Sequence, residues 1–195
     1  MPSLRTFLRR APAFLLPLAD GIDRLNQGIG RLSLGLVVIM IGVGVWNVIG
    51  RFLGRALGIN LTSNALIEAQ WYLFDLIFLL GAAYVLRHNE HVRVDVLSNR
   101  WSRVRRAWVD LGGTLLFLIP FCLMVIVVSW QSVVRSWQIG ELSPDPGGLP
   151  RYPIKTMILV SFALLILQGI AEIIKQWAFL TGQRVPPLDP PESEL

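Results

Sequence analysis

The sequence predicts an all-α integral membrane protein with four transmembrane helices. Of its 195 residues 53% are hydrophobic and only 16% are charged, and the mean hydropathy is +0.56. A soluble domain usually has about a quarter charged residues. The charges also crowd into the segments between four apolar stretches. These observations exclude a soluble globular domain and a disordered chain, which lacks apolar residues to bury.

The four stretches cover residues 32–50, 66–86, 108–134 and 154–174. The first has no charged residue. A helix of about 20 residues spans a hydrocarbon core of ~30 Å, and lipid requires each backbone to satisfy its own hydrogen bonds. The third stretch is too long for an upright span, so it tilts or extends beyond the membrane. Pro120 predicts a local bend within it, and Pro153 suits a helix start.

The flanking segments complete a domain organisation of 1–31, 32–178 and 179–195. The first contains arginines followed by a short apolar run, as in a signal peptide, but Pro12 and Pro17 interrupt that run. We therefore expect an uncleaved amphipathic helix over residues 13–31, lying on the inner membrane face. The acidic, proline-rich stretch 179–195 is expected to be a disordered cytoplasmic tail.

The basic residues predict the orientation. Thirteen of the 18 Lys and Arg residues fall in the N-terminal segment, the connector after the second span and the C-terminal tail, and five fall in the other two connectors. By the positive-inside rule both termini are cytoplasmic. These basic residues lie beside apolar stretches, at the level of lipid headgroups, so a role in nucleic-acid binding is not expected.

The residue types also restrict cofactors and metals. Cys122 is the single cysteine, which excludes a disulfide framework and a four-cysteine metal site. Both histidines, His88 and His91, lie in the connector after the second span, so haem ligation between the spans is not expected. With Glu90 and Asp95 they make only a weak metal-binding pattern. Polar capping of the second span is the favoured interpretation, and no cofactor is predicted.

Two acidic residues in the second span need an explanation. Glu68 and Asp75 are seven residues apart and share one helix face, and Asp75 lies near the midplane, where a carboxylate is costly. A proton or cation relay is one interpretation. A buried contact with another helix, of this chain or of another subunit, is favoured. Glu68 and Arg51 lie at matching depth at the outer ends of neighbouring spans, which predicts an ion pair between them.

Other residues are candidates for contacts between helices. Asn47 and Gln168 are polar residues that could hydrogen-bond across spans, and the small residues Gly35, Gly42 and Gly44 would let another helix approach closely. In the third connector Glu141 and Asp145 are expected to be exposed. This connector either docks a soluble protein or simply joins two spans.

Together these residues resemble the DctQ-like small membrane subunit of tripartite ATP-independent periplasmic (TRAP) transporters, over about residues 30–178. The resemblance rests on Arg51 followed by Phe52, Glu68, the LGAA stretch that leads to Arg87, HVRVD at residues 91–95, GELS at residues 140–143, and Leu149 followed by Pro150. The candidate structural or interface residues are Arg51, Glu68, Asp75, Gly81, His91, Asp95, Glu141 and Pro150.

The resemblance implies a non-catalytic subunit in the bacterial inner membrane. Its implied partners are a large DctM-like membrane subunit, which carries the substrate path and sodium sites, and a periplasmic DctP-like binding protein, which captures an organic acid. The small subunit would scaffold the former and help dock the latter. The alternative is a stand-alone proton-coupled carrier that uses Asp75 and Glu68.

Overall fold

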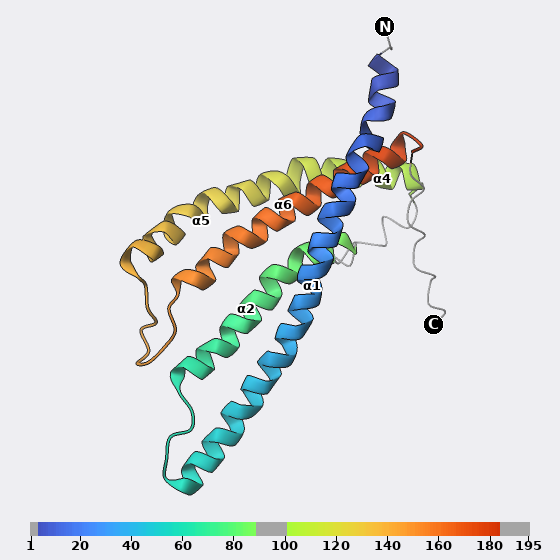
Figure 1. The fold of residues 1–195 in the computed structure, drawn as a ribbon. Coiled ribbons are helices and arrows are strands. Elements are labelled where there is room, and N and C mark those ends of the chain that lie inside the picture. Colours follow the sequence, from blue (N-terminus) through green and yellow to red (C-terminus); the bar gives the residue numbers. More distant parts are fainter. Residues whose placement is uncertain (1–3, 89–100, 184–195) are drawn as a thin grey trace, which may run out of the picture.

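Helices make up nearly all of the computed structural model, which describes residues 4–88 and 101–183, with side chains from residue 15 onward. The elements, in chain order, are α1 (Leu4–Leu57), α2 (Asn64–Arg87), α4 (Arg103–Gly113), the π-helical segment η1 (Thr114–Leu118), α5 (Ile119–Ile139) and α6 (Tyr152–Leu180). Figure 1 shows α1 and α2 as one antiparallel hairpin and α5 and α6 as a second.

Four helical stretches are long and apolar enough to span a membrane, which confirms the predicted fold class. They cover Leu15–Leu57, Asn64–Arg87, Arg103–Ile139 and Tyr152–Leu180. Each helix extends past the predicted span at both ends. Hydropathy marks only the apolar part of a helix, and the helical hydrogen bonds continue into the polar residues that flank it.

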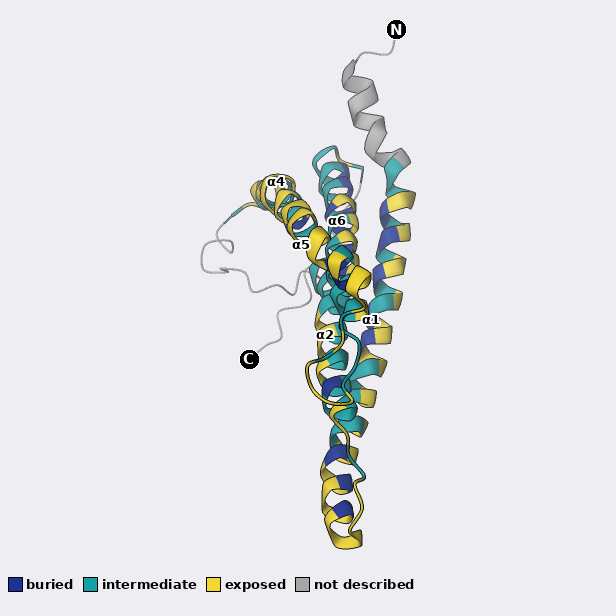
Figure 2. Cartoon of the chain, turned by 90° about the vertical axis from the view of Figure 1, so that its left-hand side faces the viewer, coloured by how far each residue is buried: buried dark blue, intermediate teal, exposed yellow. Residues whose placement is uncertain are grey.

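The helix α6 is the centre of the molecule. It packs against α1, α2, α4 and α5, and 33% of its most apolar window is buried, against 6–11% in the other three spans. Figure 2 shows exposed residues along α1 and α5 and mostly buried or half-buried residues along α6. Much of the apolar surface of the other three spans therefore faces outward.

The N-terminal segment, for which the sequence predicts an amphipathic helix over residues 13–31, is helical and joins the first span directly. The helix α1 continues without interruption for 54 residues, about 80 Å, into the first span. Ala19 and Ile22 are buried against Ala171 and Ile174. The expected boundary at residue 31 therefore lies inside a helix that packs on α6.

The third span contains a change of helix type next to Pro120. Proline lacks an N–H group, and its ring clashes with the carbonyl group four residues earlier in an α-helix. In η1 the backbone N–H of Ile119 instead donates to the carbonyl oxygen of Thr114, five residues back. A Cβ atom added to Gly169 of α6 would lie 3.1 Å from Leu118 Cδ2. The predicted disturbance at Pro120 is thus a π-helical turn that lies against α6.

Candidate functional site

Glu68 joins α2 to the connector between α5 and α6 (residues 140–151, here called the outer connector). Its side chain lies in the second turn of α2 and is only 4% exposed. The hydroxyl group of Ser143 donates to Oε1, and the backbone N–H of Leu149 donates to Oε2 at 2.6 Å. Both oxygens of the carboxylate are thus occupied by the outer connector, which holds this segment against α2.

Further contacts fix the outer connector on α2. Asn64 Nδ2 donates to the carbonyl oxygen of Pro146 at 3.0 Å, and the Tyr72 hydroxyl donates to that of Pro150 at 3.2 Å. Gly148 allows the close approach, because a Cβ atom there would lie 2.5 Å from Ser143 Cβ and 2.7 Å from the Oε2 of Glu68. The outer connector therefore packs closely on α2 and is hydrogen-bonded to it over about the first two turns of that helix.

Glu141 makes a second polar cluster, which ties the two ends of the outer connector together. Lys155 Nζ and the Ser136 hydroxyl both donate to its Oε2. These hydrogen bonds, first that from Lys155 and then that from Ser136, lower the pKa of Glu141 below its usual value. The sequence predicted an exposed Glu141, but the side chain is half-buried because these two donors lie on α5 and α6.

The outer connector itself has a defined backbone. Leu142 and Pro150 form an isolated antiparallel bridge, and the Arg151 N–H donates to the Glu141 carbonyl oxygen at 2.8 Å. Gly147 has φ +72°, in the left-handed region that favours glycine. The exposed residues of this connector are Gly140, Leu142, Pro144, Asp145, Pro146 and Gly147. They form a small surface with one carboxylate and several apolar groups.

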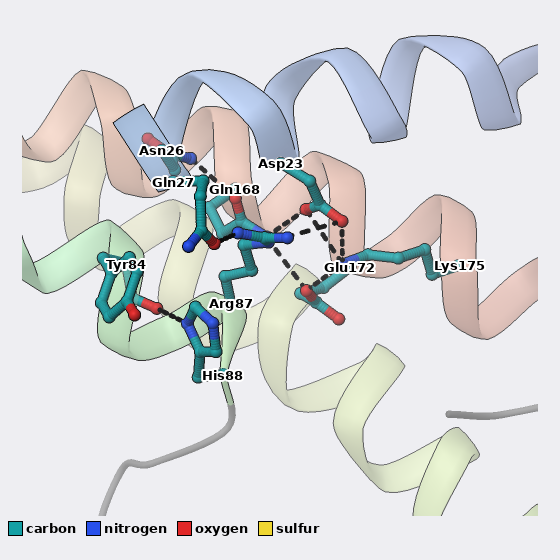
Figure 3. Close-up of polar contacts among 9 residues, drawn as sticks. All are labelled: Asp23, Asn26, Gln27, Tyr84, Arg87, His88, Gln168, Glu172 and Lys175. Atoms are coloured by element: carbon teal, nitrogen blue, oxygen red, sulfur yellow. Dashed lines mark hydrogen bonds and ion pairs between the residues drawn. The ribbon is translucent and has the colours of Figure 1, made fainter. Parts of the chain in front are cut away.

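A second buried network lies at the opposite end of the bundle, where α1, α2 and α6 meet (Figure 3). Gln168 of α6 is fully buried and accepts a hydrogen bond from Asn26 Nδ2 at 2.6 Å. Its own Nε2 donates to Asp23 Oδ1 at 2.9 Å and to Glu172 Oε1 at 3.0 Å. The side chain therefore connects two helices through three polar partners.

This network contains equal numbers of acidic and basic side chains. Lys175 Nζ lies 3.1 Å from Asp23 Oδ1 and also pairs with Glu172. Arg87 lies at the end of α2. Its Nε is 3.8 Å from Asp23 Oδ2, and its Nη1 donates to Gln27 Oε1. Two acidic and two basic side chains from three helices thus meet in one cluster. Such a cluster fixes the relative position of the helices and offers no free charge for a substrate.

The predicted ion pair between Arg51 and Glu68 is wrong. The carboxylate oxygens of Glu68 are taken by Ser143 and Leu149. Arg51 is exposed at the rim of an apolar groove of about 840 Å³ between α1 and α2, which Asn47 and Gln70 also line. The prediction fails because the outer connector, and not α1, covers the start of α2 on the face that carries Glu68.

The other predicted residues are found in different places. Asp75 is exposed in the middle of α2. Gly81 lines a second apolar groove between α1 and α2, with a volume of about 550 Å³. Pro150 is part of the outer connector. His91 and Asp95 lie outside the described residues. Within the described part of the chain no group of three or more His, Cys, Asp or Glu side chains could hold a metal ion.

The predicted contacts between helices are confirmed for the polar residues and for Gly44, where an added Cβ atom would lie 2.9 Å from Gln70 Nε2 of α2; within the described residues Gly35 and Gly42 make none. Gln168 bonds to α1, and Asn47 Nδ2 donates to the Leu66 carbonyl oxygen of α2 at 3.2 Å. Gly35 and Gly42 have open space around them. The closest approach is instead at Gly30, where an added Cβ atom would lie 2.1 Å from the Tyr84 ring. Glycine spacing alone did not identify the face of α1 that α2 covers.

Sequence reasoning missed Ser143, Asp23 and the Glu172–Lys175 pair. A signal existed for the last two: Glu172 and Lys175 are three residues apart near the end of an apolar helix, so they share a face. Asp23 is an acidic residue in a mostly basic segment. No sequence signal marks Ser143, because its role depends on how the outer connector folds.

The family model of the DctQ component of tripartite ATP-independent periplasmic transporters matches residues 40–179. The chain belongs to this family. No curated protein and no solved structure matches the chain. This DctQ protein is therefore a small membrane subunit of a TRAP transporter, a system that also comprises DctM and DctP components.

Proposed function

We propose that this DctQ protein is the non-catalytic small membrane subunit of a secondary transporter that imports an organic acid together with sodium. In this proposal it scaffolds the large DctM-like subunit in the inner membrane and helps dock the DctP-like binding protein. Both termini are cytoplasmic, and the outer connector is periplasmic. The orientation rests on the distribution of Lys and Arg residues along the sequence.

The observation that carries the docking role is the fixed outer connector. Its backbone is held on α2 by Glu68, Asn64 and Tyr72. A segment already ordered before binding loses little conformational entropy when a partner docks. Its exposed residues, among them Leu142 at 66% exposure and Asp145, offer apolar contact and one charge.

The scaffolding role is supported by the apolar surface of the spans. Large hydrophobic side chains are exposed along α1, α2 and α5, for example Val38, Phe78 and Val128 at 70–72%. Helices in lipid associate through close packing and interhelical hydrogen bonds. This surface suits lipid and a larger membrane partner at the same time.

The stand-alone carrier is not supported by the positions of its two acidic residues. Glu68 is bonded to the outer connector, and Asp75 is exposed on the outer surface of α2. A substrate or proton path would need both carboxylates to face one polar cavity. The two grooves between α1 and α2 are lined mainly by apolar residues and lie on the surface of the described part of the chain.

Transport assays in proteoliposomes test the proposal. Vesicles would contain this protein, the DctM-like large subunit of the same transporter, or both, with the binding protein outside and an inward sodium gradient. Uptake of ¹⁴C-labelled carboxylates is expected only with all three proteins and sodium. Accumulation by this protein alone, or full-rate uptake without it, would contradict the proposal.

A matched pair of variants tests docking separately. Leu142→Asp is expected to weaken uptake at limiting binding protein, because it places a charge in the apolar part of the docking surface. Arg55→Gln changes an exposed residue in the last turn of α1 and is expected to leave uptake unchanged. Equal uptake by wild type and Leu142→Asp at every binding-protein concentration would argue against docking here.

A further inference from the structure

One face of α2 is not covered by any other part of the chain that the structure describes. Apart from Asn64 at its start, the exposed residues of this helix are Trp71, Phe74, Asp75 and Phe78. Their spacing of i, i+3, i+4 and i+7 places them on one stripe. Trp71, Phe74 and Phe78 are 58–70% exposed. We call these four residues the α2 face.

Asp75 lies at the centre of this face and at the centre of the helix. It is the twelfth of the 24 residues of α2, so it is about 16 Å from either end. Within the described residues no side chain or backbone group donates to its carboxylate. A carboxylate at this depth is costly when it faces hydrocarbon, and such residues pair with one another or with donors inside a protein assembly.

We infer that the α2 face packs against a transmembrane helix of the large subunit that carries a Lys, Arg or His side chain at the depth of Asp75. The three aromatic side chains supply the packing surface, and the carboxylate supplies the specificity. This inference rests on the proposed function, because it takes the large subunit as the partner.

Charge complementarity selects this occupant over two others. A second copy of the chain, related by a two-fold axis through this face, would bring two Asp75 carboxylates together, and like charges repel. Lipid chains would leave the carboxylate without a donor. A helix with a basic side chain satisfies the carboxylate and covers the aromatic residues.

Photo-crosslinking in the intact complex tests the location of the contact. A benzoylphenylalanine residue would replace Phe78 in an otherwise wild-type chain co-expressed with the large subunit. The matched control is the neighbouring Leu79, which is half-buried on the side where its carbonyl oxygen accepts a hydrogen bond from Ser161 of α6. An adduct with the large subunit is expected from position 78 and not from position 79.

Charge variants test the chemistry of the contact. Asp75→Lys is expected to reduce the large subunit recovered with the tagged chain about tenfold, because two basic groups would then meet in lipid. Asp75→Asn, which keeps a hydrogen-bond acceptor, is expected to have a smaller effect. Asp145→Lys, the same change in the exposed outer connector, is expected to leave the recovery unchanged. The amount of each variant in the membrane fraction controls for insertion.

The outcomes separate this inference from the proposed function. Recovery of the large subunit without an adduct from position 78, an adduct with a second copy, or wild-type recovery with Asp75→Lys would overturn the inference alone. Failure of the wild-type chain to bring down any large subunit would overturn the proposed function. The crosslinking arm keeps Asp75 intact, so it stays decisive even where a variant fails to insert.

Discussion

Gln168 of α6 and Asn26 of α1 share a 2.6 Å hydrogen bond, although they are 142 residues apart in the sequence and both side chains are at most 1% exposed. The bond lies in the network that joins α1, α2 and α6. At the opposite end of the bundle Glu68 joins α2 to the outer connector. The bundle is therefore fixed by polar contacts at both ends, while its apolar sides remain free to contact lipid or a partner.

The first prediction concerns this buried amide. Gln168→Leu leaves Asn26 Nδ2, Asp23 and Glu172 without one partner each, so we expect the free energy of unfolding in detergent to fall by about 1–2 kcal/mol. The control is Gln70→Leu, since Gln70 forms no hydrogen bond among the described residues. Equal stability of the two variants would show that the network contributes little.

The second prediction concerns Glu68. Glu68→Ala removes the acceptor of the Leu149 N–H group, so the amide of Leu149 should exchange with solvent about tenfold faster. Hydrogen-exchange mass spectrometry of the peptide containing Leu149 measures this. The same peptide in Asp145→Asn, a change at an exposed carboxylate of the outer connector, should exchange as in the wild type.

The third prediction concerns the close approach at Gly148. Gly148→Ala places a methyl group on Ser143 and on the Glu68 carboxylate, so we expect a loss of about 1–3 kcal/mol in the free energy of unfolding. Gly112→Ala is the matched control, because an added Cβ atom there meets no atom within 4 Å and alanine favours a helix. If Gly148→Ala left the free energy of unfolding unchanged, the outer connector would be able to move away from Glu68 without loss of stability.

The fourth prediction is a pH dependence that arises from Glu141. Hydrogen bonds from Lys155 and Ser136 lower its pKa in the folded state. The stabilisation is therefore fully present above the ordinary carboxyl pKa and is lost as the pH falls through the lowered value. The difference in thermal stability between the wild type and Glu141→Gln should be present at neutral pH and shrink in acid. A difference that stays constant down to strongly acidic pH would contradict this assignment.

The sequence predicted the fold and, among the polar contacts, those of Gln168 and Asn47. Four apolar stretches predict four helices because lipid leaves the backbone no other solution. Gln168 and Asn47 were predictable as contacts because a polar side chain within an apolar helix must find a partner. The partner of Glu68 was not predictable. It is a backbone N–H group 81 residues away, placed by a connector whose fold depends on long-range packing.

The position of Asp75 illustrates a second limit. The seven-residue spacing correctly places Glu68 and Asp75 on one face of α2, since helical periodicity fixes relative directions. Periodicity does not fix which neighbour that face meets. The outer connector covers the face at Glu68 and ends before Asp75, so two residues of one stripe have opposite surroundings.

The central place of α6 has a consequence for biogenesis. The ribosome makes this helix after the other three spans, yet it contacts each of them. The three earlier spans enter the bilayer before their common partner exists, so the native bundle closes only after synthesis of residues 152–180. A premature stop codon upstream of this helix would leave the earlier transmembrane helices without the helix on which they pack. Quality-control proteases of the membrane would then encounter an incompletely packed bundle.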